Sequence, residues 1–208
     1  MMIKRILIGT FILLGTLIVL LLYLPMIRPP PAQAPIQTAG EVQIGGPFTL
    51  INTRGEEVTE SLLKGHFSLI YFGFTYCPDI CPLALQTITE ALTAIGPEGE
   101  NVMPVFISLD PDRDTPEVVA SYLDHFHPRF VGLTGTLDQT TAAAAQYRVY
   151  AKKSFLKDAD GNDTADYTVD HTGYIYLMTP AGRYGDHFSK DATAADITAR
   201  LKQVLAGS

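Results

Sequence analysis

The chain contains two cysteines, and both lie in the segment YFGFTYCPDICPLAL, residues 71–85. Cys77 and Cys81 are separated by three residues, and each is followed by a proline. Two thiols this close together can form a structural disulfide, cycle between dithiol and disulfide, or supply two ligands to a metal ion. Three kinds of chemistry are therefore open to this segment.

The cysteines lie where a strand is expected to give way to a helix. The apolar run LIYFGF precedes Cys77, and we expect the helix to begin near Pro82 because proline favours the first helical turn. Unpaired N–H groups at a helix N-terminus stabilise a nearby anion and lower the pKa of a thiol there. We therefore predict thiolate character, which both disulfide exchange and metal binding require.

A structural disulfide and a thioredoxin-type dithiol each fit this segment incompletely. A disulfide across so short a loop restricts the unfolded chain little and so adds little stability. A thioredoxin-type dithiol has the spacing C-x-x-C, whereas this chain has C-x-x-x-C. The proline expected opposite such a dithiol, just before the penultimate strand, is replaced by His171 in VDHTGYIYLM.

His171 raises the alternative of a metal site. Two thiolates and one imidazole form a soft, low-coordinate ligand set that suits Cu(I), and also Cu(II) or Zn(II) if a further ligand joins. The chain has no third cysteine, so a closed four-sulfur zinc site is excluded. The remaining histidines have no visible partner or lie where solvated histidines are common: His66, His125, His127 and His187.

Short apolar runs rich in β-forming residues alternate with amphipathic helices along the chain. The predicted strands are FSLIYFGF, NVMPVFISL, RFVGL and YIYLM. Apolar residues at helical spacing mark three helices: Leu85, Ile88, Leu92 and Ile95, then Val119, Tyr122, Leu123 and Phe126, and last Ile197, Leu201, Val204 and Leu205. This alternation is typical of an α/β fold with parallel strand pairs joined by crossovers. Residues 147–171 interrupt it and predict a β-hairpin or long loop inserted into the sheet.

The N-terminal residues predict a membrane anchor. A basic pair precedes an uncharged apolar run from Ile6 to Leu24, long enough to cross a hydrocarbon core of about 30 Å. A cleavable signal, which has a shorter apolar region, is the alternative. Basic residues before the run favour a cytoplasmic N-terminus and export of the residues after Pro25. We expect an anchor in residues 1–27, a Pro/Ala-rich linker in 28–44 and one domain in 45–208.

The charge composition of the chain bears on which classes of partner it can bind. The net charge is −7, and no basic stripe is present that could neutralise a phosphate backbone. Nucleic acid is therefore not expected as a partner. Export to an oxidising compartment lets the two thiols cycle between reduced and oxidised forms.

Three separated motifs, YFGFTYCPDICP, VFISLDPDRDTPE and VDHTGYIYLMTPAG, follow one another in this order. Together they resemble the Sco/SenC family of membrane-anchored copper proteins, over residues from about 45 to 205. The resemblance implies a thioredoxin-like fold with an inserted β-hairpin, preceded by one N-terminal transmembrane helix. It also implies a copper site, for Cu(I) or Cu(II), formed by Cys77, Cys81 and His171.

The resemblance implies a membrane-anchored copper chaperone that delivers copper to the dinuclear copper centre of cytochrome c oxidase subunit II. The alternative is a thiol-disulfide reductase that maintains the copper-ligating cysteines of that subunit, with Cys77 and Cys81 as a redox-active dithiol. Implied partners are subunit II, a copper donor chaperone and a thioredoxin-like thiol reductant. The expected location is the bacterial inner membrane, crossed once, with the N-terminus in the cytoplasm and the C-terminal domain in the periplasm or another extracytoplasmic space.

Other residues in these motifs are less clearly assigned. Tyr76 occupies a place where many relatives carry histidine, which should alter the surroundings of the site but not its three ligands. Asp79 either tunes the site or meets a partner, or it is a solvated turn carboxylate. The segment DPDRDTP is expected to connect a strand to a helix started by Thr115 and Pro116.

Overall fold

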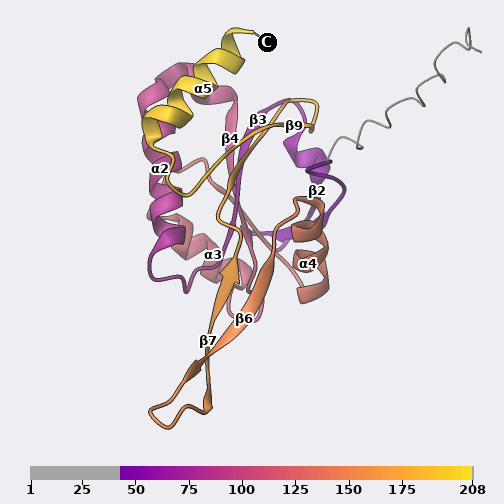
Figure 1. Ribbon diagram of the computed structural model, residues 1–208. Helices are drawn as coiled ribbons and strands as arrows, with labels where there is room; N and C mark the ends of the chain where they lie inside the picture. The colour runs from indigo at the N-terminus through magenta and orange to yellow at the C-terminus, as the bar shows by residue number, and fades with distance from the viewer. Residues whose placement is uncertain (1–42, 208) are drawn as a thin grey trace, which may run out of the picture. The chain divides into compact units, whose positions relative to one another are not determined.

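The computed structural model describes residues 43–207 of the chain (Figure 1). The predicted anchor, residues 1–27, lies outside the described residues, as does nearly all of the predicted linker. Within the described range, no helix combines the length and apolar character needed to span a bilayer. The anchor therefore stays a prediction from the sequence.

The described residues alternate between strands and helices. The strands are β1 Thr49–Asn52, β2 Glu57–Thr59, β3 Phe67–Gly73, β4 Val102–Ser108, β5 Val131–Thr134, β6 Ala151–Lys157, β7 Asp163–His171, β8 Ile175–Met178 and β9 Tyr184–Phe188. The helices are α2 Ile80–Ile95, α3 Pro116–Leu123, α4 Leu137–Gln146 and α5 Ala194–Ala206, with short 3-10 helices η2 Glu60–Leu63 and η3 Gly96–Asn101. All four predicted strands are confirmed as β3, β4, β5 and β8, and the three predicted helices as α2, α3 and α5.

Seven strands form one mixed sheet in the order β2-β1-β5-β4-β3-β8-β9. The neighbouring strands β3, β4 and β5 run parallel, and β8 pairs antiparallel with β3. Helices α2 and α3 make the crossovers between the parallel strands, in agreement with the alternating sequence pattern. Helix α2 lies beside α5 on one side of the sheet, and α4 lies on the other (Figure 1).

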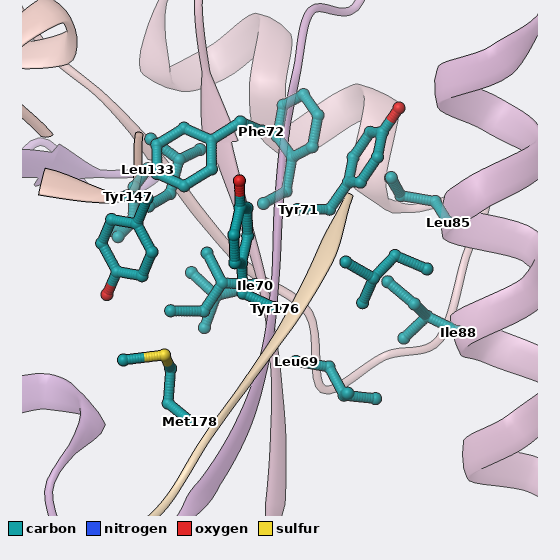
Figure 2. Close-up of a cluster of buried hydrophobic side chains, with 14 of the residues drawn as sticks. Leu69, Ile70, Tyr71, Phe72, Leu85, Ile88, Leu133, Tyr147, Tyr176 and Met178 are labelled. Carbon is teal, nitrogen blue, oxygen red and sulfur yellow. The ribbon is translucent and has the colours of Figure 1, made fainter. Parts of the chain in front are cut away.

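Strand β3 forms the centre of the core, and all seven of its residues are buried. A strand covered on both faces reads as a continuous apolar run, because its alternate side chains enter two different layers. Tyr71 points toward Leu85 of α2, whereas Phe72 points to the opposite side, where it packs against Tyr147 and Tyr176 (Figure 2). The end of β3 is thus held rigidly between the two layers.

Strands β6 and β7 form a β-hairpin that projects from the sheet (Figure 1). The hairpin prediction for residues 147–171 is confirmed, but insertion into the sheet is wrong. Within the described range, β6 and β7 pair only with each other. Hydrogen bonds to the main sheet therefore do not fix the position of this hairpin, which ends at His171.

Replacing Leu85 of α2 by alanine should destabilise the domain by about 2–5 kcal/mol, because its side chain is fully buried and the deletion leaves a cavity. The matched control is Leu83→Ala on the same helix, where the side chain is 60% exposed and the change should stay within about 0.5 kcal/mol. Urea unfolding of the full-length chain in detergent, followed by circular dichroism, measures both. Equal losses from the two variants would contradict the described orientation of α2.

Candidate functional site

Both cysteines lie in residues 74–81, here called the cysteine loop, which comprise the connection from β3 to α2 and the first two residues of that helix. Cys77 is partly exposed and Cys81 is fully buried, and both are free thiols. Helix α2 begins at Ile80, two residues before the predicted start at Pro82, so Cys81 lies inside its first turn. The backbone N–H of Cys81 donates to Sγ of Cys77 over 3.4 Å. The helix N-terminus therefore faces Cys77, in agreement with the sequence-based prediction.

The thiols differ in acidity. The side chain of Cys81, together with backbone N–H groups at the helix start, lowers the pKa of Cys77 to about 5. The neighbouring Cys77 sulfur, together with burial, raises the pKa of Cys81. At neutral pH the pair therefore holds one proton, and Cys77 is the thiolate.

His171 approaches the buried cysteine from the end of β7. Its Nε2 lies 3.5 Å from Sγ of Cys81, and its Nδ1 lies 2.9 Å from the carbonyl oxygen of Thr172. Because a carbonyl oxygen only accepts, Nδ1 carries the hydrogen in the neutral ring, and the lone pair of Nε2 faces the sulfur. The ring is also flanked edge-on by Tyr71 and Phe74, with centroids 6.1 and 5.9 Å away.

Gly73, the last residue of β3, makes room for the buried thiol. A Cβ atom at this position would lie 3.0 Å from Sγ of Cys81 and 2.9 Å from Cε1 of Tyr71. Real Cβ atoms rarely approach other atoms so closely, so a larger residue would displace the sulfur or the ring. The missing side chain thus lets Cys81 lie directly against the end of the central strand.

The segment DPDRDTP, predicted as a simple connection, also holds the cysteine loop. The buried carboxylate of Asp114 accepts hydrogen bonds from the backbone N–H of Thr75, over 3.1 Å, and from its hydroxyl, over 2.6 Å. Ser108, at the end of β4, donates to the same carboxylate. Burial raises the pKa of Asp114, while these donors act against the rise. Thr115 caps α3 and Pro116 begins it, as predicted.

Tyr76 and Asp79 both lie at the surface of the cysteine loop. The Tyr76 side chain is 73% exposed, and the guanidinium of Arg113 lies 4.8 Å from the centre of its ring. Asp79 occupies the N-cap position of α2 but makes no side-chain hydrogen bond to the helix within the described residues. Its position agrees with a solvated carboxylate next to Cys77.

The other histidines lie elsewhere in the domain. His125 and His127 follow the C-terminus of α3, where their Nδ1 atoms contact the backbone at Tyr122 and Arg129. His187 is on β9, hydrogen-bonded to the hydroxyl of Tyr184. Across residues 43–207, no three His, Cys, Asp or Glu side chains converge into a ready-made metal cage. Of the predicted ligands, the side chains of Cys81 and His171 lie in contact, and Sγ of Cys77 contacts the backbone N–H of Cys81.

Comparison with known proteins places this arrangement in a family. The family model described as SCO1/SenC matches residues 36–206. The chain is 41% identical to the SCO2-like protein of Rickettsia prowazekii over 162 residues, which cover 78% of this chain and 77% of that protein. The fold and the sequence can therefore be compared with solved relatives.

Copper is bound in several solved relatives, including the two that follow. ScoI of Bradyrhizobium japonicum is 44% identical, with a TM-score of 0.69 covering 77% of this chain and 98% of that one. Yeast Sco1 is 38% identical, with a TM-score of 0.70 covering 80% and 90%. The sheet with its extra hairpin is the thioredoxin-like fold of these Sco structures, in agreement with the expectation from the motifs. This protein belongs to the SCO1/SenC family.

Proposed function

We propose that this protein is a copper chaperone that binds copper through Cys77, Cys81 and His171. It delivers the metal to the dinuclear copper centre of cytochrome c oxidase subunit II. The observation that carries the proposal is the 3.5 Å contact between Nε2 of His171 and Sγ of Cys81, beside a second free thiol. Two relatives with solved structures hold copper, which supports the same choice of metal.

The donor set fits a soft metal held for transfer. Two thiolates and a neutral imidazole favour Cu(I), and the low ligand number leaves room for an incoming donor. Cys77 is already a thiolate at neutral pH, so only Cys81 has to lose a proton when a metal binds. Cys77 is also the accessible member of the pair, so ligand exchange with a partner would begin there.

The sequence supports a membrane location and a set of partners. The apolar run before the domain favours a single anchor in the bacterial inner membrane, with the domain in the periplasm. In an oxidising compartment the pair can close to a disulfide, and metal and disulfide compete for the same sulfurs. A chaperone there needs a copper donor and a thioredoxin-like thiol reductant that keeps Cys77 and Cys81 reduced.

A thiol-disulfide reductase is the second candidate, favoured by the unequal exposure of the two thiols. The accessible Cys77 thiolate would attack a partner's disulfide, forming a mixed disulfide and releasing one partner sulfur as a thiolate, which takes up a proton. Cys81 would then lose its proton and attack Sγ of Cys77, releasing the second partner thiol. Two electrons pass to the partner, and the thiol reductant restores the Cys77–Cys81 pair.

Replacing His171 by alanine should weaken Cu(I) binding about ten-fold or more, because one of three ligands is lost. The measurement is a competition titration of the full-length, reduced chain in detergent against a chromophoric Cu(I) chelator, without oxygen. His187→Ala, which removes an imidazole from β9, is the matched control and should bind like the wild type. Disulfide turnover that survives His171→Ala, with equal Cu(I) affinity in both proteins, would favour the reductase and contradict the three-ligand site.

Alkylation of Cys77 in the metal-free, reduced protein should show a midpoint near pH 5. The lowered pKa means that the reactive thiolate persists as the pH falls and is protonated only below that midpoint. An ordinary thiol would instead lose reactivity below about pH 8.5. Iodoacetamide labelling between pH 4 and 9, with the site identified by mass spectrometry, measures the curve.

The control for this measurement is Cys81→Ala. It removes the side chain that is the largest cause of the lowered pKa of Cys77, so the midpoint should move upward. A wild-type midpoint at the ordinary thiol value, unchanged in Cys81→Ala, would contradict the lowering of the Cys77 pKa by Cys81.

A further inference from the structure

The hairpin that carries His171 is held against the cysteine loop by side chains. Strands β6 and β7 share no ladder with the seven-stranded sheet within the described range. Val169 of β7 is buried in the core, and a second set of contacts surrounds Tyr167 on the same strand. Tyr167, Val169 and His171 alternate by two residues and therefore share one face of β7.

Arg113, between β4 and α3, is the centre of these contacts. Its Nε pairs with the carboxylate of Asp110, whose side chain has no exposed surface. Its Nη1 donates to the carbonyl oxygen of Tyr167 over 3.0 Å, and its guanidinium lies 3.8 Å from the centre of the Tyr167 ring. The hydroxyl of Tyr167 donates to Asp110 over 2.7 Å. One arginine therefore fixes both the backbone and the side chain of β7 at this point.

The same guanidinium also reaches the cysteine loop. It lies 4.8 Å from the centre of the Tyr76 ring, and Tyr76 directly precedes Cys77. Arg113 thus touches both segments that supply the three sulfur and nitrogen donors. A planar, delocalised cation can stack on an aromatic ring and hydrogen-bond in its own plane at once, which lysine cannot do.

One nitrogen atom of the Arg113 guanidinium differs from the others. Its Nη2 is buried and has no hydrogen-bond partner among the described residues. Buried N–H groups are usually paired, so this nitrogen adds nothing to the stability that the other contacts of Arg113 provide. Those other contacts fix the spacing between β7 and the cysteine loop.

We propose that Arg113 is a positioning residue that sets the placement of His171 relative to Cys77 and Cys81. The consequence for copper affinity rests on the proposed function, whereas the placement of His171 exists in the metal-free protein. Arg113 holds β7 four residues before His171, on the face from which His171 projects. Loss of this hold moves the imidazole away from Cys81 and leaves the two thiols in place.

A double-mutant cycle tests the proposal. Arg113→Lys should weaken Cu(I) binding by the full-length, reduced chain about ten-fold, the size typical of residues that orient a metal ligand. In a His171→Ala background the same substitution should have no effect, because no imidazole remains to be positioned. An equal loss in both backgrounds would overturn the proposal, since Arg113 would then act on the thiols or on general stability.

A second variant guards against misfolding. Tyr167→Phe removes only the hydroxyl that donates to Asp110 and keeps the ring on which the guanidinium lies. It should give a smaller loss of Cu(I) affinity than Arg113→Lys, again only when His171 is present. Arg54→Lys is the matched control, because Arg54 forms an exposed ion pair with Glu56 in a part of the sequence distant from Arg113. This variant should bind Cu(I) like the wild type.

A metal-free measurement separates the positioning role of Arg113 from copper binding. Proton NMR of the reduced apoprotein should show cross-relaxation between the His171 ring and the rings of Tyr71 and Phe74, which flank it. Arg113→Lys should weaken these signals, and Arg54→Lys should not. Unchanged signals in Arg113→Lys would overturn the positioning role. A wild-type protein that binds no copper, yet loses these signals in Arg113→Lys, would refute the proposed function and uphold the positioning role.

Discussion

Asp114 joins the carboxyl ends of three adjacent parallel strands, and the geometry of the candidate site depends on that junction. Its carboxylate binds Thr75 just after β3 and Ser108 at the end of β4, and its carbonyl oxygen accepts from the hydroxyl of Thr134 at the end of β5. Burying a carboxylate costs free energy unless hydrogen-bond donors surround it, so the loops that carry these donors are held in place around Asp114. The cysteine loop is therefore held as rigidly as the sheet to which it is bonded.

The proposed metal ligands are predictable from the sequence, whereas the residues that hold them in place are not. Cys77 and Cys81 stand out by rarity and spacing, and His171 by its place before an apolar strand. Asp114 and Arg113 lie in a segment that Thr115 and Pro116 already mark as the start of a helix, so the sequence predicts no further role for it. Their partners lie far away along the chain, 39 residues for Thr75 and 54 for Tyr167, and nothing local in the sequence marks such contacts.

Some elements of the fold are likewise predictable from the sequence, and others are not. Buried strands and amphipathic helices follow periodic apolar patterns, so β3, β4 and α2 are predicted closely. Helix α4, with the sequence LDQTTAAAAQ, has small residues in place of an apolar stripe, and its pattern predicts no helix. The hairpin is recognisable from its sequence pattern, but its separation from the main sheet is not. Alternation of side chains along a strand does not indicate which other strand it pairs with.

The contact between Cys81 and His171 joins residues 90 positions apart, so we expect the proposed ligands to come together late in folding. The cysteine pair is local and comes together with the first turn of α2. We expect the imidazole to reach its place only after β4, β5 and the hairpin have formed, since closing so long a segment is entropically costly until those contacts exist. An unfolded chain then presents two thiols without the nitrogen, so the proposed three-ligand site would exist only in the folded domain.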